Sequence, residues 1–302
     1  MKASVIHQYG GPDVLKYEDY PDPSVGAGQV LVRVAAAGIN PIDIKRRSGV
    51  MKDFFPIKFP GVIGVDVAGT IVKIGPGVEG FAVGDKVFAY ADQAYAELCT
   101  IPAAILVKIP QGLDVIEAAA LPVVTTTGYM LIDKGTGIKA RQTILVIGAL
   151  GSVGRSAVYT AKQRGAVVIA GVRKTQLQQA ASIGADQVIA TDDESAIAKL
   201  PAVDAVADTV GGKTAATFLG KVVKGGVFAS VLGPPSNAKD YPAVRVVPVF
   251  AAPDLKIQTE MANAVVNKKL VIPIGLKLPL SKAGEGHAAV EKGDIGKVLL
   301  TA

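Results

Sequence analysis

Roughly the first 120 residues alternate short apolar runs with turn signals. The runs include GQVLVRVAAAG, AGTIVKIGPGVEGFAVGDKVFAY and AYAELCTIPAAILVKIP, and between them lie breaks rich in proline and glycine, such as YPDPSVGAG and FFPIKFPGVIG. Short apolar runs separated by turns are typical of strands in an all-β unit. We therefore expect a barrel-like β domain in this part of the chain.

The rhythm then changes, because helical patterns alternate with apolar runs. The segments are TILVIG, SAVYTAKQRG, AVVIAGV, LQQAASIGA, DQVIA, AVDAVADTVGG, AATFLGKVVKGG and VFASVLG. Such alternation predicts parallel strands joined by crossover helices. One more helix, DLKIQTEMANAVVNKK, precedes an ending that reads strand, helix, strand. We predict an α/β chain in which a β domain, residues 1–122 and 266–302, is interrupted by a doubly wound nucleotide-binding domain, residues 123–265.

Composition narrows the class of protein. Half of the residues are hydrophobic, yet no run approaches the roughly 18 to 20 apolar residues that a membrane span needs. The start, MKASVIHQYGG, has no apolar stretch of signal-peptide length. We therefore expect a cytoplasmic protein with no membrane partner.

Charge and cysteine content argue against two further classes. The net charge is +6, but the basic residues are scattered, so a solvated surface is favoured over a nucleic-acid partner. A single cysteine, Cys99, cannot form an internal disulfide, and two histidines leave little for a soft-metal site.

A glycine turn, GALGSVG, follows the run TILVIG and opens a helical segment. In the pattern G-x-G-x-x-G, Ala149 takes the first position and Gly151 and Gly154 take the second and third. Gly151 would let the backbone approach a pyrophosphate, and Gly154 would let helix and strand pack closely. A ligand-free connection is the alternative, but the flanking strand-helix-strand context favours binding by Gly148, Gly151, Ser152, Val153 and Gly154 at the helix N-terminus.

The next strand, AVVIAGV, ends where an acidic residue binds the ribose of NAD in this kind of fold. No Asp or Glu occurs from Gly151 to Ala185, and Arg173 and Lys174 stand at that place. Both cations suit a 2′-phosphate. Simple capping of a loop is the alternative, but it does not account for the missing carboxylate. The sequence therefore predicts NADPH as the cofactor.

Several segments together carry a family resemblance over essentially the whole chain. They are YGGPDVL, AAGINPIDIKRRSG, GVIGVDVAGTIVKIGPGV, VGDKVFAY, EAAALPVVTTTGY, GALGSVG, DTVGG and AAVEKGDIGKVLL. The chain resembles the medium-chain dehydrogenase/reductase superfamily and, within it, the zinc-independent quinone oxidoreductase (zeta-crystallin-like) family. The resemblance implies a GroES-like catalytic domain, an inserted Rossmann domain, and a cleft between them for cofactor and substrate.

The zinc motifs of related dehydrogenases are missing. Where zinc-dependent relatives carry a cysteine and a Gly-His-Glu motif, this chain reads Asn40-Pro41-Ile42-Asp43 and Gly64-Val65-Asp66, and it has no cysteine cluster. We expect no metal. Without a Lewis acid to generate an alkoxide, the acceptor should already be electron-poor, which fits quinones and enones.

The resemblance also implies acceptor-site residues. Asn40 aligns with the asparagine that lines the substrate cleft in quinone oxidoreductases and could donate its amide to an acceptor oxygen; a turn-forming role before Pro41 is the alternative. Lys45 stands where many relatives show a tyrosine, and the next family tyrosine is replaced within MKDFF. Lys45 in the cleft mouth could attract an anionic acceptor, or it could be an ordinary exposed lysine.

The cofactor contacts implied by the resemblance lie at a helix start and at two strand ends. Thr127 matches a threonine at a helix start near the cofactor phosphates, although it could simply cap the helix. The strand-end residues are expected beside the adenosine and the nicotinamide, with ordinary packing as the alternative: Asp208, Val210, Gly211, Leu232 and Gly233.

Other polar residues have no singular role in the sequence. Cys99 is expected in the core and His287 in a structural position on a helix. Tyr90 and Tyr95 could supply a proton, but nothing in the pattern selects either of them.

The leading functional prediction is an NADPH-dependent quinone reductase. An enone or alkenal reductase on the same scaffold is the nearest alternative, and a non-catalytic NADPH-binding redox sensor or RNA-binding protein is an alternative of another class. We also predict a homodimer formed by edge-to-edge pairing of the nucleotide-binding sheets, with PAVRVVPVFAAP as the interface strand.

Overall fold

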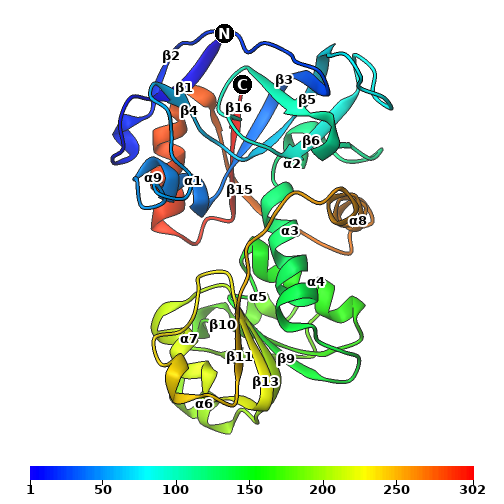
Figure 1. Cartoon of the computed structure of the whole chain (residues 1–302). Helices are drawn as coiled ribbons and strands as arrows, with labels where there is room; N and C mark the ends of the chain where they lie inside the picture. Colours follow the sequence, from blue (N-terminus) through cyan, green and yellow to red (C-terminus); the bar gives the residue numbers. More distant parts are fainter. The chain divides into compact units, whose positions relative to one another are not determined.

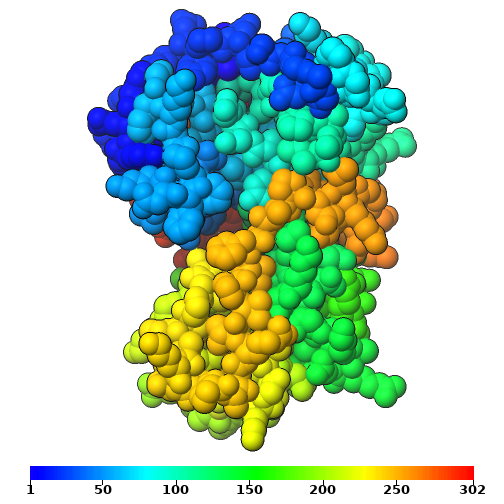
Figure 2. Space-filling model, in the orientation of Figure 1, coloured from blue at the N-terminus to red at the C-terminus, as the bar shows by residue number.

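The computed structural model describes residues 1–302, which divide into two compact units (Figure 1). Unit 1 comprises residues 1–123, 253–268 and 272–302, and unit 2 comprises residues 124–252 and 269–271. The helix α8 (Leu255–Val266), which we had expected in the nucleotide-binding domain, lies in unit 1 and contacts strand β8 (Leu106–Lys108). Figure 2 shows this orange segment against the blue-green part of unit 1.

Unit 1 is built mainly of antiparallel strands, as the apolar runs predict. One sheet has the order β2-β1-β4, and a larger sheet has the order β15-β16-β3-β5-β6-β8, with β7 paired to β3. The remaining bounds are β1 (Lys2–Ile6), β2 (Lys16–Asp19), β3 (Gln29–Ile39), β4 (Gly61–Val62), β5 (Asp66–Ile74), β6 (Lys86–Tyr90), β7 (Leu98–Pro102), β15 (Ile274–Pro279) and β16 (Lys297–Thr301).

Strand β3 shows why these runs form half-buried strands. Its valines at positions 30, 32 and 34 alternate with more exposed residues and are at most 5% exposed, so one face of the strand lies in the core. The helices of unit 1 besides α8 are α1 (Pro41–Arg47), α2 (Val115–Ala118) and α9 (Ala283–Lys292). Helix α3 (Pro122–Met130) begins at the end of the first segment of unit 1 and continues in unit 2.

Unit 2 is a six-stranded sheet with the order β11-β10-β9-β12-β13-β14, and every neighbouring pair is parallel. The carboxyl ends of all six strands therefore lie at one edge of the sheet. From β9 the strands are added first toward β11 and then, from β12, toward β14, and doubly wound folds bind ligands at the point where this order reverses. The strands are β9 (Thr143–Ile147), β10 (Val167–Val172), β11 (Gln187–Ala190), β12 (Val203–Asp208), β13 (Val222–Ser230) and β14 (Arg245–Pro248). The predicted doubly wound arrangement is confirmed.

Helices cover this sheet, as expected for a parallel sheet with buried central strands. The segment after α3 continues as a π-helix, Leu131–Thr136, and the other helices of unit 2 are α4 (Ser152–Gln163), α5 (Leu177–Ala180), α6 (Glu194–Lys199) and α7 (Gly212–Leu219). In the central strand β9, residues Ile144 to Ile147 are fully buried.

Two local predictions are wrong. The segment AATFLGKVVKGG is not one helix, because α7 ends at Leu219 and Val222 already pairs with Val203 as the start of β13. The β-branched valines after Gly220 suit the strand, and the glycine ends the helix. Thr127 does not lie at a helix start either, because α3 begins at Pro122, a residue favoured at the first helical position.

Candidate functional site

The glycine turn lies at the carboxyl edge of the unit 2 sheet, at the end of β9. Gly148 has a φ of +77°, and a Cβ there would lie 2.4 Å from Thr209 Oγ1. The amides of Gly148 and Ala149 both donate to the carbonyl of Gly171 on β10, at 2.9 and 3.2 Å. The chain therefore turns sharply at the sheet edge and enters α4 directly.

Gly151 and Gly154 differ in what requires them. A Cβ at Gly154 would lie 2.1 Å from the carbonyl oxygen of Gly148, so helix and strand pack too closely for any side chain. Gly151 has an ordinary φ of −66°, and its Cβ would meet only that same carbonyl oxygen, at 3.3 Å. The packing of the protein therefore excludes a side chain at Gly154, whereas at Gly151 it leaves a single tight contact, as expected where a ligand approaches the backbone.

Helix α4 presents its N-terminus at this place. Its N-cap is Gly151 and its first turn holds no acidic side chain. The first amides of a helix have no partner within the helix, and the helix dipole favours an anion there. Ser152 and Val153 therefore fit a pyrophosphate.

Arg173 and Lys174 follow β10 directly, and both are exposed. Lys174 pairs through Nζ with Asp193 Oδ2 at 2.9 Å, which raises the pKa of Lys174, and its amide donates to Asp192 Oδ1 at 2.7 Å. The acidic residues missing after β10 are thus supplied by the loop after β11. Both cations are candidates for a 2′-phosphate, and the planar, two-pronged guanidinium makes Arg173 the stronger of the two.

Asp208 holds the loop after β12 and is fully buried. Its Oδ1 accepts the amides of Val210 and Gly211 at 3.0 and 2.9 Å, and its Oδ2 accepts the hydroxyl of Ser230 at 2.7 Å. Ser230 Oγ in turn accepts the amide of Leu232 at 3.0 Å. Both carboxylate oxygens are therefore used inside the protein, so the geometry favours a positioning role for Asp208 over direct contact with a ligand.

The two loops that Asp208 joins expose apolar side chains at the sheet edge. Val210 is 48% and Leu232 47% exposed. A Cβ at Gly211 would lie 2.8 Å from Leu232 Cδ1, and one at Gly148 would lie 2.8 Å from Val210 Cγ2, so these loops and the glycine turn are in contact. Gly233 follows with a φ of +90°. This apolar surface at the switch point suits the flat ring of a nucleotide.

Thr127 is buried near the same helix N-terminus. Its neighbour Gly128 would place a Cβ 2.5 Å from Ser156 Cβ and 2.6 Å from the carbonyl oxygen of Val153. Helix α3 therefore packs directly on the first turns of α4 at this position.

Asn40, in unit 1, caps α1 and is 1% exposed. Its Nδ2 donates to Asp66 Oδ2 at 2.8 Å and, more weakly, to the carbonyl of Gly38 at 3.4 Å. Its Oδ1 accepts from Lys297 Nζ at 2.6 Å. The amide that we expected to meet an acceptor is engaged inside the protein, and Asn40 precedes Pro41 as the turn alternative also requires.

Lys297 is a functional candidate that sequence reasoning missed. It is 3% exposed, and its Nζ lies 2.7 Å from Asp66 Oδ2. Asp66 Oδ1 accepts the amide of Val123, in the first turn of α3, at 2.8 Å. A buried ammonium must be paired, and the lysine within the apolar run GKVLLT was the available signal. Its positive charge lies between the two stretches that would carry zinc ligands in the zinc-dependent relatives.

Lys45 lies on α1, partly buried and without an ion pair. Its carbonyl accepts the amide of Met51, whose own carbonyl accepts the amides of Phe54 and Phe55. Phe54 is 77% and Phe55 50% exposed. Where many relatives have a tyrosine, this chain therefore has Lys45, which lies beside an exposed apolar loop that contains Phe54 and Phe55.

Burial raises the pKa of three further side chains of unit 1. It raises the pKa of Tyr90 to about 12 and that of Tyr95 well above its usual value, so both phenols keep their protons at neutral pH. It also raises the pKa of Cys99 to about 12, which makes this core thiol unreactive.

No group of three or more His, Cys, Asp or Glu side chains is arranged to hold a metal ion, and no helix is both long and apolar enough to cross a bilayer.

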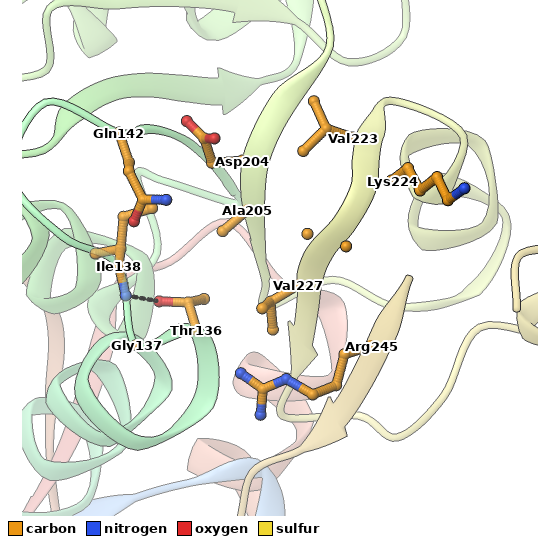
Figure 3. A pocket seen from close by; sticks show the side chains of 12 residues that line it. Thr136, Gly137, Ile138, Gln142, Asp204, Ala205, Val223, Lys224, Val227 and Arg245 are labelled. Atoms are coloured by element: carbon orange, nitrogen blue, oxygen red, sulfur yellow. Dashed lines mark hydrogen bonds between the residues drawn. The ribbon is translucent and has the colours of Figure 1, made fainter. Parts of the chain in front are cut away.

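A cavity of about 370 Å³ lies at the opposite, amino edge of the unit 2 sheet (Figure 3). It is lined by residues 136–138, by Gln142 before β9, and by residues of β12, β13 and β14. Its polar lining side chains include Gln142, Asp204, Lys224 and Arg245. Because ligands of doubly wound folds bind at the carboxyl edge, this cavity is separate from the candidate nucleotide site.

Comparisons with known proteins found two matching families and several relatives. The family "Alcohol dehydrogenase GroES-like domain" matches residues 26–111, and the family "Zinc-binding dehydrogenase" matches residues 183–300. The chain is 31% identical over 322 residues to the "Chloroplast envelope quinone oxidoreductase homolog" of Arabidopsis thaliana, covering 99% of this chain and 98% of the relative.

A second relative and a solved structure are also similar over the full chain. The "NADPH-dependent alkenal/one oxidoreductase, chloroplastic" of Arabidopsis thaliana is 33% identical over 319 residues, covering 99% of this chain and 79% of the relative. The Escherichia coli quinone oxidoreductase complexed with NADPH has a TM-score of 0.89 and 26% identity, with both chains fully covered.

Proposed function

Because the chain belongs to the medium-chain dehydrogenase/reductase superfamily and to its quinone oxidoreductase family, we propose that it reduces a quinone with NADPH. At the coarser level it is an oxidoreductase that uses a nicotinamide cofactor. The choice of NADPH rests on Arg173, and the choice of a quinone rests on the cluster formed by Asn40, Asp66 and Lys297.

The observation that carries the proposal is the glycine turn at the N-terminus of α4. The turn is fixed by hydrogen bonds and by the tight packing of Gly154, and the side of Gly151 that a Cβ would occupy meets only the carbonyl oxygen of Gly148, 3.3 Å from that ideal Cβ. Together with the N-terminus of α4, this side of the turn fits a pyrophosphate between two nucleosides. Val210 and Leu232 would then cover an aromatic ring of the same dinucleotide.

Arg173 supports the choice of the phosphorylated cofactor. It is exposed at the end of β10, where the ribose of a dinucleotide lies in this fold, and a guanidinium binds phosphate through two parallel hydrogen bonds. Lys174 would contribute less because a flexible ammonium lacks the two-pronged geometry of a guanidinium. When bound, NADPH supplies the hydride that reduces the acceptor.

The acceptor side of the proposal rests on the Asn40, Asp66 and Lys297 cluster. An electron-poor carbonyl that receives a hydride develops negative charge on oxygen, and positive charge nearby stabilises it. Lys297 has three N–H donors, and Asn40 Oδ1 and Asp66 Oδ2 take two of them. Asn40 acts in this proposal by holding the ammonium in place.

An enone or alkenal is the second candidate acceptor. The full-length similarity to an alkenal/one oxidoreductase favours it, and conjugate addition of a hydride also places negative charge on oxygen. Lys45, which has no ion pair, favours an acceptor with an anionic group within either class.

A panel of acceptors tests the proposal. Purified protein is mixed with NADPH and with small quinones, enones, alkenals and carboxylated analogues, and the loss of NADPH absorbance is followed. Fast turnover with quinones is expected, and preferential turnover of enones would move the protein to the second candidate. Tight NADPH binding with no turnover of any acceptor would instead support a redox sensor, or an RNA-binding protein if RNA also binds.

The reduction should proceed without zinc. The stretches at residues 40–43 and 64–66 offer no thiolate or imidazole, although one matching family is named for zinc binding. We expect elemental analysis of the purified protein to find no stoichiometric zinc and chelators to leave turnover unchanged. One tightly bound zinc per chain would contradict the proposal.

The cytoplasmic location also stays a prediction. Cell fractionation followed by immunodetection tests it, and recovery of the protein in an organelle fraction would contradict it.

A further inference from the structure

A line of hydrogen-bonded side chains runs through the interior of unit 1. Arg47 Nη1 lies 3.2 Å from His287 Nδ1, His287 Nε2 lies 3.1 Å from Tyr95 Oη, and Tyr95 Oη lies 3.2 Å from Asp43 Oδ2. None of these four residues is more than 2% exposed. They join α1, α9 and the loop before β7.

Donor chemistry fixes the direction of this line. A guanidinium only donates, so His287 Nδ1 accepts and Nε2 carries the hydrogen that Tyr95 Oη accepts. The hydroxyl hydrogen of Tyr95 is then left for Asp43. Burial, and next the charge of Arg47, lower the pKa of His287 to about 3, so the neutral ring that this direction requires is the stable one. Arg47 itself is fixed by Glu291 and by the carbonyl of Gly10.

Asp43 ends the line at the first turn of α1. Its Oδ2 also accepts the amide of Asn40 at 2.8 Å, while its Oδ1 is buried without a partner. Burial raises the pKa of Asp43 to about 7; Asp66 adds to the rise, and the Asn40 amide, Lys297 and Arg46 oppose it. Arg46 is itself paired with Asp92 through two hydrogen bonds, at 2.7 and 3.1 Å. The carboxyl group that accepts the backbone amide of Asn40 therefore has a pKa near neutral pH.

We propose that Asp43 is a positioning residue for the reduction, whose carboxylate holds the backbone of Asn40 and thereby the contacts of Asn40 with Lys297 and Asp66. This inference rests on the proposed function. A carboxylate accepts stronger hydrogen bonds than a neutral acid, so protonation weakens its hold on the Asn40 amide and on Tyr95. Because Asp66 also accepts the Val123 amide, the same cluster anchors the start of α3.

The pH dependence of kcat/KM tests the proposal with the best acceptor of the panel. The wild-type value is expected to fall with a midpoint near pH 7 as Asp43 gains its proton. Asp43→Asn resembles the protonated form at every pH, so it should lose this step and, at high pH, be roughly tenfold less active, mainly in kcat. Tyr95→Phe removes a donor to the carboxylate and should move the midpoint to higher pH.

Asp85→Asn is the matched control. It removes a carboxylate of unit 1 that pairs with Lys108, and neither Asp85 nor Lys108 is among the charges that shift the pKa of Asp43. It should keep the wild-type midpoint. A wild-type profile without the step, or an Asp43→Asn profile that retains it, would overturn the proposal.

A spectroscopic readout separates this inference from the proposed function. The backbone amide resonance of Asn40 should titrate with a midpoint near pH 7 in the wild type and stay constant in Asp43→Asn. If it does so while no acceptor is reduced, the proposed function fails and the coupling of Asp43 to Asn40 stands. If the resonance does not titrate, the inference fails even in an active enzyme.

Discussion

Gly151 and Gly154 occupy one turn but have different neighbours, and this difference yields the sharpest test at the scale of single residues. An ideal Cβ would lie 2.1 Å from the carbonyl oxygen of Gly148 at Gly154 and 3.3 Å from the same oxygen at Gly151, so a side chain at Gly151 needs a much smaller shift of the backbone. A side chain at Gly151 would take up the space that we assign to the pyrophosphate.

Gly151→Val should therefore weaken NADPH binding by roughly a hundredfold or more, and it should lower the midpoint of thermal unfolding without cofactor less than Gly154→Ala does, because its Cβ approaches the Gly148 carbonyl at 3.3 Å and not at 2.1 Å. Gly154→Ala should instead lower the unfolding midpoint, because helix and strand must separate to admit the methyl group. Calorimetric titration and thermal unfolding of both variants measure these effects. A Gly151→Val variant that binds NADPH normally would remove the proposed site.

Arg173 carries the choice between the two nicotinamide cofactors. A hydrogen bond to a charged group contributes roughly 1.5 to 3 kcal/mol, so Arg173→Ala should weaken NADPH binding about 10- to 150-fold and leave NADH nearly unchanged. Lys174→Ala should act in the same direction but less, because a flexible ammonium lacks the two-pronged geometry of a guanidinium. Equal loss of affinity for both cofactors in Arg173→Ala would mean that the residue supports the loop only.

Residue roles that depend on a local pattern could be predicted, and roles that depend on distant partners could not. The glycine turn and the cations after β10 follow from spacing along one strand-helix-strand unit. Lys297 meets Asn40 and Asp66 only because β16 returns beside β3. No spacing in the sequence encodes that contact.

At the scale of elements, α9 packs against α1 and the loop before β7 through a buried histidine that must stay neutral. His287 links this helix to Arg47 on α1 and to Tyr95. The sequence placed His287 on a helix but could not select Tyr95, because its partners on α9 and α1 are far from it in the chain. Strand β13 was misjudged for a similar reason, since its first residues form a strand by pairing with β12.

Stability at acidic pH tests this packing. The pKa of His287 is lowered to about 3 in the fold, so the unfolded chain binds more protons between about pH 3 and 6.5, and the contribution of His287 to stability is lost as the pH falls. Asp43 has the opposite sign, because its raised pKa makes the folded state bind more protons between about pH 4 and 7.

Urea unfolding at a series of pH values measures the contributions of His287 and Asp43 to the free energy of unfolding. Relative to the wild type, His287→Gln should gain stability as the pH falls from about 6.5 to about 3, by at most about 1.4 kcal/mol per pH unit. Asp43→Asn should show the reverse trend. Parallel stability curves for the wild type and His287→Gln would contradict the assignment of a neutral buried histidine.

At the scale of the whole molecule, the sequence predicted a β unit interrupted by a doubly wound unit, because the period of the apolar pattern changes where the second unit begins. The place of α8 was harder to foresee. An amphipathic helix carries no mark of the surface it covers, and residues 253–268 belong to unit 1.

The open edge of the unit 2 sheet argues for self-association. Strand β14 is the last strand of the sheet and lies in the segment that the sequence suggested as an interface. It has one paired neighbour, β13, and Phe250 follows it with 81% exposure. Pairing of two such edges about a twofold axis would satisfy the free backbone groups and cover the aromatic rings.

We therefore predict a homodimer at micromolar concentration, measured by light scattering. Phe250→Lys should shift it toward the monomer, because two like charges would face each other across the axis. Phe54→Lys is the matched control, since Phe54 is a similarly exposed aromatic residue in unit 1, 77% exposed, and should leave the dimer intact. A monomeric wild type would refute the predicted assembly, and a dimer unaffected by Phe250→Lys would place its interface elsewhere.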